Sequence, residues 1–287
     1  MLTRDNIAEY QQRYGLSYHV PYAMTADSHI GLRGKSVIEI GGSLPEGFVR
    51  DGLGVRRWLA IEEMAYWHEI STSGGTQGTP PRDMAVRRLA DAGPGDAAAA
   101  YGVFSGRVEE LPDALRGQFD AGFSIAAFEH IDRLAMTLEG IHAALRPGGR
   151  LFTMFSPIWS AHDGHHLPNI RDRHGREFSF SSSPIPPWGH LLMRPPELFQ
   201  HLISHTDRET AAEIVYYVHH SAHINRLFTE DYVAYCRESR FELERCDATF
   251  PATLPPDLQR ELERRHPGYR SFANNGMLLV LRKPEGS

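Results

Sequence analysis

Histidines are concentrated in the second half of the chain, where one short run combines residues that could move a proton. The run comprises His162, Asp163, His165 and His166. A histidine with a pKa near neutrality can take a proton from an attacking hydroxyl group, and a neighbouring aspartate can orient its ring. Two further interpretations stay open. The run could be a polar turn, or its His and Asp side chains could bind a metal ion.

Two acidic residues lie at the ends of short apolar runs, in a pattern that suits a bound nucleoside. Glu39 lies inside its run, separated by one residue from a Gly-Gly turn, and Glu62 ends the next apolar run. Glycines let the backbone approach a ligand, and these carboxylates can accept hydrogen bonds from an amine and from ribose hydroxyls. Each feature alone also fits a tight turn and a solvated acid. A nicotinamide cofactor fits poorly, because Pro45 lies where a helix should donate N–H groups to a pyrophosphate.

Apolar runs alternate with helical patterns, and this order predicts a parallel sheet covered by helices on both faces. The runs typical of strands cover residues 36–40, 58–61, 102–105, 119–125, 150–155, 241–250 and 277–282. Helical spacing marks residues 3–14, 133–145 and 229–239. Residues 18–22 are expected to be irregular, and the Gly/Pro-rich residues 71–81 predict a mobile loop. Ligands of such sheets bind beyond the carboxyl ends of the strands.

Composition narrows the class of protein. The chain has 287 residues, of which 41% are hydrophobic and 23% charged, so it can build a core. A formal charge of −6 argues against a nucleic-acid partner. No apolar run is long enough for a membrane helix and the N-terminus has no signal-peptide core, so we expect a cytoplasmic protein without a membrane partner. Cys236 and Cys246 are too few for a disulfide framework or a cysteine zinc site.

The order of these features resembles that of the class I S-adenosylmethionine-dependent methyltransferases, which have a Rossmann-like fold. Five segments resemble the family's motifs in the family's order, and together they span about residues 34–156. They are residues 37–42, 61–63, 106–112, 119–131 and 145–151. The chain from Phe241 onward resembles the family's last two strands. Ser43 and Pro45 depart from the glycines usual in the first motif, and Arg107 stands where the family often has an aspartate facing the adenine amine.

The resemblance implies an α/β fold with a doubly wound, mostly parallel, seven-stranded sheet and an antiparallel last strand. It also implies a substrate cap inserted after the fifth strand. The expected domains are an N-terminal helical and aromatic lid segment, a cofactor-binding core, a substrate cap, and the C-terminal part of the core sheet. Their boundaries are residues 1–33, 34–156, 157–226 and 227–287.

Carried over by position, the resemblance assigns S-adenosylmethionine (SAM) as cofactor and names residues to hold it. These are Glu39, Gly41, Gly42, Ser43, Glu62, Val108, Ser124 and Ala126. The catalytic candidates are the run described above, His162, Asp163, His165 and His166. Tyr18, His19 and Trp159 are expected to contact the acceptor, although Trp159 would equally suit a small core within the cap. No residue is assigned as a metal ligand, and we expect His130 to position other groups.

We therefore expect methyl transfer to a small molecule, at a hydroxyl group of a sugar or secondary metabolite, with a histidine as general base. An alternative keeps the cofactor and changes the reaction, so that the enzyme cyclises or cleaves SAM or transfers its aminocarboxypropyl group. A third is a binding protein with a degenerate cofactor site. The partner is then a small molecule, and the sequence is compatible with a homodimer.

Overall fold

The fold is built on one eight-stranded sheet. A computed structural model describes residues 1–42, 44–63 and 87–286. The strand order is β3-β4-β2-β1-β5-β6-β10-β9. The strands are β1 (Ser36–Ile40), β2 (Arg57–Glu62), β3 (Arg87–Arg88), β4 (Tyr101–Ser105), β5 (Phe119–Ile125), β6 (Leu145–Phe155), β9 (Glu242–Pro251) and β10 (Asn274–Arg282).

The expected mostly parallel sheet is confirmed. Strands β3, β4, β2, β1, β5 and β6 pair in parallel, and the last strand, β10, runs antiparallel to both of its neighbours. The seven strands expected from the sequence are all present, and the two-residue strand β3 adds an eighth at one edge. Strand β10 lies between β6 and β9, so the last strand of the chain is inside the sheet.

Helices cover both faces of the sheet, as continuous apolar strands require. Helices α1 (Ile7–Tyr14) and α2 (His19–Ile30) pack on one face, and α5 (Leu134–Ala144) and α9 (Thr229–Glu238) on the other. Side chains alternate along each strand. Val37 accordingly joins the apolar cluster under α2, while its neighbour Ile38 joins the cluster under α5.

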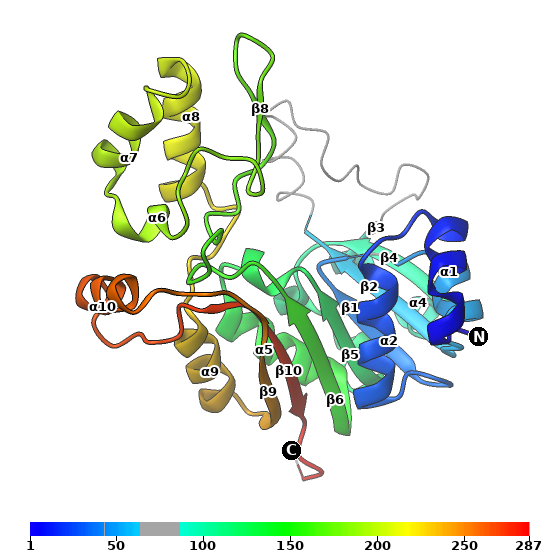
Figure 1. Ribbon diagram of the computed structural model, residues 1–287. Coiled ribbons are helices and arrows are strands. Elements are labelled where there is room, and N and C mark those ends of the chain that lie inside the picture. The colour runs from blue at the N-terminus through cyan, green and yellow to red at the C-terminus, as the bar shows by residue number, and fades with distance from the viewer. Residues whose placement is uncertain (43, 64–86, 287) are drawn as a thin grey trace.

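Residues 157–226 form a separate layer beyond the carboxyl ends of the parallel strands. They contain the hairpin β7 (Ile170–Arg171) and β8 (Glu177–Phe178), and helices α6 (Gly189–Leu192), α7 (Pro195–Leu202) and α8 (Arg208–His219). Figure 1 shows this segment directly above that edge of the sheet. It has its own apolar cluster, which also takes in Leu262 of α10 (Pro256–Arg265).

Trp159 belongs to this cluster, which corrects its expected role as an acceptor contact. The side chain is 7% exposed, and Arg226 lies over its ring at 5.6 Å. A ring buried in this way offers no face to a substrate. Trp159 therefore serves the small core within residues 157–226, which was the other interpretation of its sequence.

The N-terminal segment differs from expectation at residues 18–22. This stretch is not irregular, because α2 begins at His19 and carries Pro21 in its first turn. The first N–H groups of a helix have no partner within the helix, so a proline is tolerated there. The loop predicted at residues 71–81 lies outside the described residues. Within the described part of the chain, we find no helix long and apolar enough to cross a membrane.

Candidate active site

The turn after β1 is organised around the buried carboxylate of Glu39. Its Oε2 atom accepts hydrogen bonds from the Leu44 amide at 2.9 Å and from the Trp58 indole at 2.6 Å. These two bonds fix the carboxylate, and Oε1 lies on the side of Gly42, where a Cβ atom would be 3.0 Å away. Burial raises the pKa of Glu39 to about 7, and the two hydrogen bonds partly oppose that rise.

Glu62 lies at the matching position on the adjacent strand. It ends β2, is 2% exposed, and pairs in register with Ser105 at the end of β4. Its backbone carbonyl accepts the Gly106 amide at 3.0 Å. The carboxyl ends of β1, β2 and β4 therefore place two acids side by side along one edge of the sheet.

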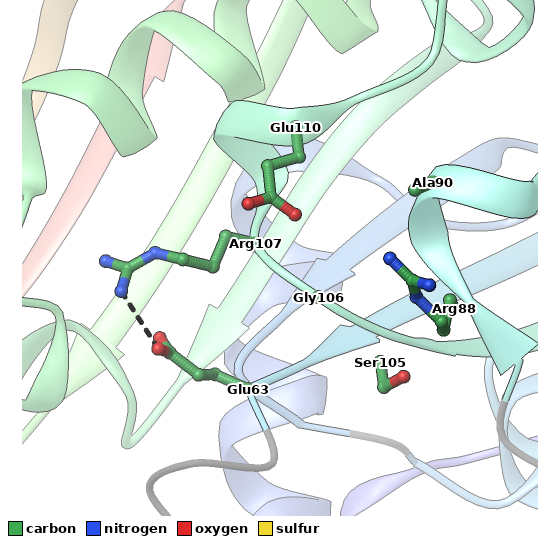
Figure 2. A pocket seen from close by; sticks show the side chains of 7 residues that line it. All are labelled: Glu63, Arg88, Ala90, Ser105, Gly106, Arg107 and Glu110. Carbon is green, nitrogen blue, oxygen red and sulfur yellow. Dashed lines mark hydrogen bonds and ion pairs between the residues drawn. The ribbon is translucent and has the colours of Figure 1, made fainter.

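A cavity of about 270 Å³ lies beside Glu62, at the ends of β2, β3 and β4. Its lining side chains include two acids and two arginines. Figure 2 shows Arg107 and Glu63 joined on one side of this cavity and Arg88 on the other. The Arg107 guanidinium bonds Glu63 at 2.9 Å and also pairs with Asp132 and Glu109. These partners explain how an arginine is accommodated where the resemblance expects an acid.

The turn after β5 packs against the turn after β1. The Ser124 hydroxyl donates to the Ile40 carbonyl at 2.9 Å, so it ties the two strands together. Ala126 has a positive φ of 48°, which is uncommon for a residue other than glycine and is often found at functional sites. Val108 is buried beneath α5, where Gly140 allows the helix to approach the Val108 carbonyl closely.

These residues fit a SAM cofactor. The fixed Glu39 carboxylate suits an ammonium group, the Glu62 carboxylate suits a ribose diol, and the cavity beyond Glu62 continues along the same edge of the sheet. A Cβ atom on Gly42 would lie 3.0 Å from Oε1 of Glu39, so a larger residue at this position would crowd the carboxylate. Ser43, the remaining member of the expected set, lies outside the described residues.

A short turn beyond β5, Phe128–His130, carries the next group of polar side chains. Asn225 fixes this turn by donating through its side chain to the carbonyls of Phe128 and Ile131, at 2.7 and 2.9 Å. The backbone N–H of Asn225 donates to the backbone carbonyl of Glu129 at 2.9 Å. The end of the 157–226 segment is thereby held against the tip of β5.

Glu129, His130 and His166 meet at this tip. One ligand atom from each of the three lies within 4.8 Å of the others, and the two imidazole centroids are 4.6 Å apart. Glu129 has no exposed surface, and burial raises its pKa to about 8. Burial lowers the pKa of His130 to about 4 and that of His166 well below its usual value.

The other members of the expected catalytic run lie elsewhere. His162 Nδ1 is 2.9 Å from Asn275 Oδ1 and 3.6 Å from Asp163, so this pair is directed toward the start of β10. His165 is 2% exposed, accepts the Leu167 amide at 3.1 Å, and has its pKa lowered to about 3 by burial. The run therefore does not act as one group, and only His166 reaches the tip of β5.

Aromatic side chains of α2 and the residue before it line the opposite side of this group. Desolvation of the hydroxyl group, and secondly the Glu129 carboxylate, raise the pKa of Tyr18 to about 12, and the same two causes raise the pKa of Tyr22. The Tyr18 ring stacks on His19 at 4.2 Å, and the Tyr22 ring lies 6.3 Å from Phe250. Tyr18 and Phe250 are 45% and 46% exposed, so apolar surface is open to solvent here.

Three residues of this candidate group, Glu129, Tyr22 and Asn225, were not among the site residues expected from the sequence. Glu129 and His130 lie in the fourth motif, directly after a buried strand, and that position was the available signal for them. Nothing local distinguished Tyr22, because its segment was expected to be irregular. Asn225 is separated from the β5 tip by more than ninety residues, so its role depends on the fold.

One comparison matches part of this chain to a known family. Residues 82–153 match a family model described as a methyltransferase domain. That range includes β4, β5 and most of β6. A search of curated proteins found no match.

Many solved structures are similar to this chain at low identity. One is a SAM-dependent methyltransferase from Mesorhizobium loti, with 15% identity, a TM-score of 0.43, and coverage of 93% of this chain and 98% of that one. Another is geranyl diphosphate C-methyltransferase from Streptomyces coelicolor, with 11% identity, a TM-score of 0.45, and coverage of 93% and 81%. A third comes from a Haloferax volcanii complex of the Trm112 methyltransferase activator with a methyltransferase, with 15% identity, a TM-score of 0.45, and coverage of 98% and 95%.

Proposed function

We propose that this chain, a class I SAM-dependent methyltransferase, transfers a methyl group to a hydroxyl group of a small molecule bound at the tip of β5. The observation that carries the proposal is the meeting of His166 with Glu129 and His130 opposite the aromatic side chains of Tyr18 and Tyr22. In this proposal, side chains that can accept or donate a proton lie opposite aromatic side chains on which the ring of an acceptor can stack.

Bound SAM supplies a methyl group on a positively charged sulfur. In our proposal Glu39 holds its ammonium group and Glu62 its ribose hydroxyls, and these contacts orient the cofactor across the ends of β1 and β2. Gly41 and Gly42 let the backbone approach, and Ser124 and Ala126 shape the neighbouring turn. An acceptor hydroxyl bound at the β5 tip would attack in line with that methyl group, and the attack needs the hydroxyl to be deprotonated.

Deprotonation depends on His166 in this proposal. Of the three histidines in the run, it is the one whose ring contacts His130, at 4.6 Å, and so lies at the β5 tip. Its φ of 45° places the imidazole there in a backbone conformation that few side chains adopt. Asp163 pairs with His162 and is left without a part in proton transfer.

The acceptor is held between two segments. Residues 1–33 supply Tyr18, His19 and Tyr22 as a lid, and residues 157–226 act as a cap that brings His166 over the sheet edge. Exposed Tyr18 and Phe250, with Tyr22 between them, favour an acceptor with a ring face, either a sugar or an aromatic ring. The net charge of −6 favours such a molecule over a nucleic acid.

The test is product analysis with a panel of hydroxylated sugars and phenols. S-adenosylhomocysteine together with an O-methylated acceptor is the expected result, whereas methylthioadenosine would indicate cleavage of SAM or transfer of its aminocarboxypropyl group. His166→Asn should lower kcat by about 10²–10⁴-fold with S-adenosylhomocysteine affinity retained, because asparagine tolerates positive φ and only proton removal is lost. His220→Gln, at an exposed histidine of the same segment, is the matched control. Equal turnover in both variants would refute the assignment of His166.

A further inference from the structure

We propose that Glu129, His130 and His166 form a binding site for a divalent metal ion of the zinc class. The site lies at the β5 tip, next to the region that the proposed function gives to the acceptor hydroxyl. Its catalytic role rests on that function, but binding of the ion does not.

The geometry is that of a three-residue ligand set. Two imidazole nitrogens and one carboxylate oxygen lie within 4.8 Å of one another. Ligand atoms on a single tetrahedral zinc ion lie about 3.4 Å apart, so side-chain shifts on the order of 1 Å bring the set onto an ion. The two rings meet at 76°, and nitrogens of crossed rings can point at a common centre.

Buried polar atoms in this group point to a ligand. Neither carboxylate oxygen of Glu129 has a hydrogen-bond partner of good geometry among the described residues, and the residue is fully buried. The nearest donors are the amides of Glu129 itself and Ser156. The Nδ1 atom of His166 is also buried without a partner among those residues. Leaving such groups unpaired in a buried site is unfavourable, and a bound cation would satisfy them.

The surrounding contacts orient both histidines. His130 Nδ1 bonds the carbonyl of His223, and this contact fixes the orientation of the His130 ring. The His223 ring in turn bonds the carbonyl of His166 through Nε2 at 2.9 Å. A backbone carbonyl that holds the second nitrogen of a ligand imidazole is the usual outer support of a metal site. One residue, His223, therefore supports both candidate ligands.

The donor set selects the kind of ion. Two imidazoles and one carboxylate are typical of catalytic zinc and of related transition metals, whereas magnesium prefers an all-oxygen set. Three protein ligands leave a fourth position open. An acceptor hydroxyl bound there would lose its proton more easily, because the cation stabilises the alkoxide. With the ion bound, His166 serves as a ligand in place of the base, and the hydroxyl proton passes to solvent.

The experiment measures binding of Zn²⁺ alone. The chain is treated with a chelator and titrated with Zn²⁺ by calorimetry, without cofactor or acceptor. We expect one tight site per chain, visible absorption bands when Co²⁺ replaces Zn²⁺, and X-ray absorption at the zinc edge that reports two imidazoles and an oxygen ligand. The wild-type chain suffices for these three readouts.

Variants then locate the site. Glu129→Gln and His166→Asn should each weaken Zn²⁺ binding by more than about 100-fold, while His220→Gln leaves it unchanged. S-adenosylhomocysteine binding and the thermal unfolding midpoint check that each variant is folded. Absence of Zn²⁺ binding, or binding unaffected by both site variants, overturns the inference. Methyl transfer that persists in the metal-free chain and still depends on His166 would overturn the catalytic role of the ion and leave the proposed function standing.

Discussion

Gly41 and Ala127 bring the turns after β1 and β5 into direct contact. Gly41 has a φ of 80°, and a Cβ atom built on it would lie less than 3.0 Å from the Cβ of Ala127, closer than real Cβ atoms approach. Because Gly41 has no side chain, the turn that follows Glu39 can lie in direct contact with the turn that carries Glu129. This spacing sets the distance between the proposed cofactor and acceptor regions.

Gly41→Ala should destabilise the fold and weaken cofactor binding. The left-handed conformation costs an alanine about 1–2 kcal/mol, and the clash with Ala127 adds to that. Gly175→Ala is the matched control, because Gly175 also has a φ of 80° but has open space around its Cβ position. Chemical denaturation measures the free energy of unfolding of both variants. The loss in Gly175→Ala reports the backbone strain alone, and the extra loss in Gly41→Ala reports the clash with Ala127. Equal losses of stability would show that contact with Ala127 is unimportant.

Glu62→Ala should lower the affinity for S-adenosylhomocysteine by at least about tenfold. Two hydrogen bonds from ribose hydroxyls to a carboxylate contribute about 1.5–3 kcal/mol each, and ~1.4 kcal/mol is a factor of ten. Glu62→Gln keeps one acceptor oxygen and should lose less. Calorimetric titration measures both, and an unchanged dissociation constant for Glu62→Ala would remove this residue from the site.

Much of the sheet could be predicted from the sequence, because buried parallel strands leave a local signature. The apolar runs at residues 36–40 and 119–125 coincide with β1 and β5 to the residue. The positions of Glu39, near the end of β1, and of Glu62, at the end of β2, could be predicted for the same reason. Helix α2 was missed because residues 18–22 were expected to be irregular, whereas the first turn of this helix includes Pro21, which that position tolerates.

The histidine run could not be resolved in the same way. His162, His165 and His166 are close in sequence, yet they contact Asn275, Leu167 and His130 respectively. Spacing along a loop does not determine which side chain turns toward the sheet. That choice depends on tertiary contacts, including the bond from the His223 ring to the His166 carbonyl.

Cofactor affinity should rise with pH through the titration of Glu39. Burial raises the pKa of this carboxyl to about 7 in the folded chain, so it is largely protonated below that pH. A carboxylate is needed to pair with the cofactor ammonium group, so the affinity for S-adenosylhomocysteine should increase up to about tenfold per pH unit below pH 7 and level off above it. Binding should release a proton near pH 7.

The free chain should show the opposite trend in stability. The folded state holds the Glu39 proton over the range from about 4.5 to 7, where the unfolded state has lost it. The free energy of unfolding therefore falls as pH rises through this range. Glu39→Gln should flatten both profiles. A wild-type affinity that does not change between pH 6 and pH 8 would contradict the assigned ammonium contact.

Asn225 should control turnover without touching either substrate. Its side chain and amide hold three carbonyls of the turn that carries Glu129 and His130, and its Oδ1 accepts the Tyr232 hydroxyl at 2.9 Å. Asn225→Ala leaves carbonyls of this turn without their donors, which costs about 1–3 kcal/mol for each buried group. The turn should loosen, so kcat should fall while S-adenosylhomocysteine affinity stays near the wild-type value, because Glu39 and Glu62 are on other strands.

Tyr232→Phe is the matched variant for this prediction. It removes the hydroxyl that donates to Asn225 and leaves the three bonds to the turn in place. Its kcat should therefore stay close to that of the wild type even where its unfolding midpoint drops. Steady-state kinetics at saturating SAM, with denaturation curves for both variants, makes the comparison. A different outcome is that kcat falls in both variants in proportion to their loss of unfolding free energy. Asn225 would then support only the fold, and β5 itself would position the turn that carries Glu129 and His130.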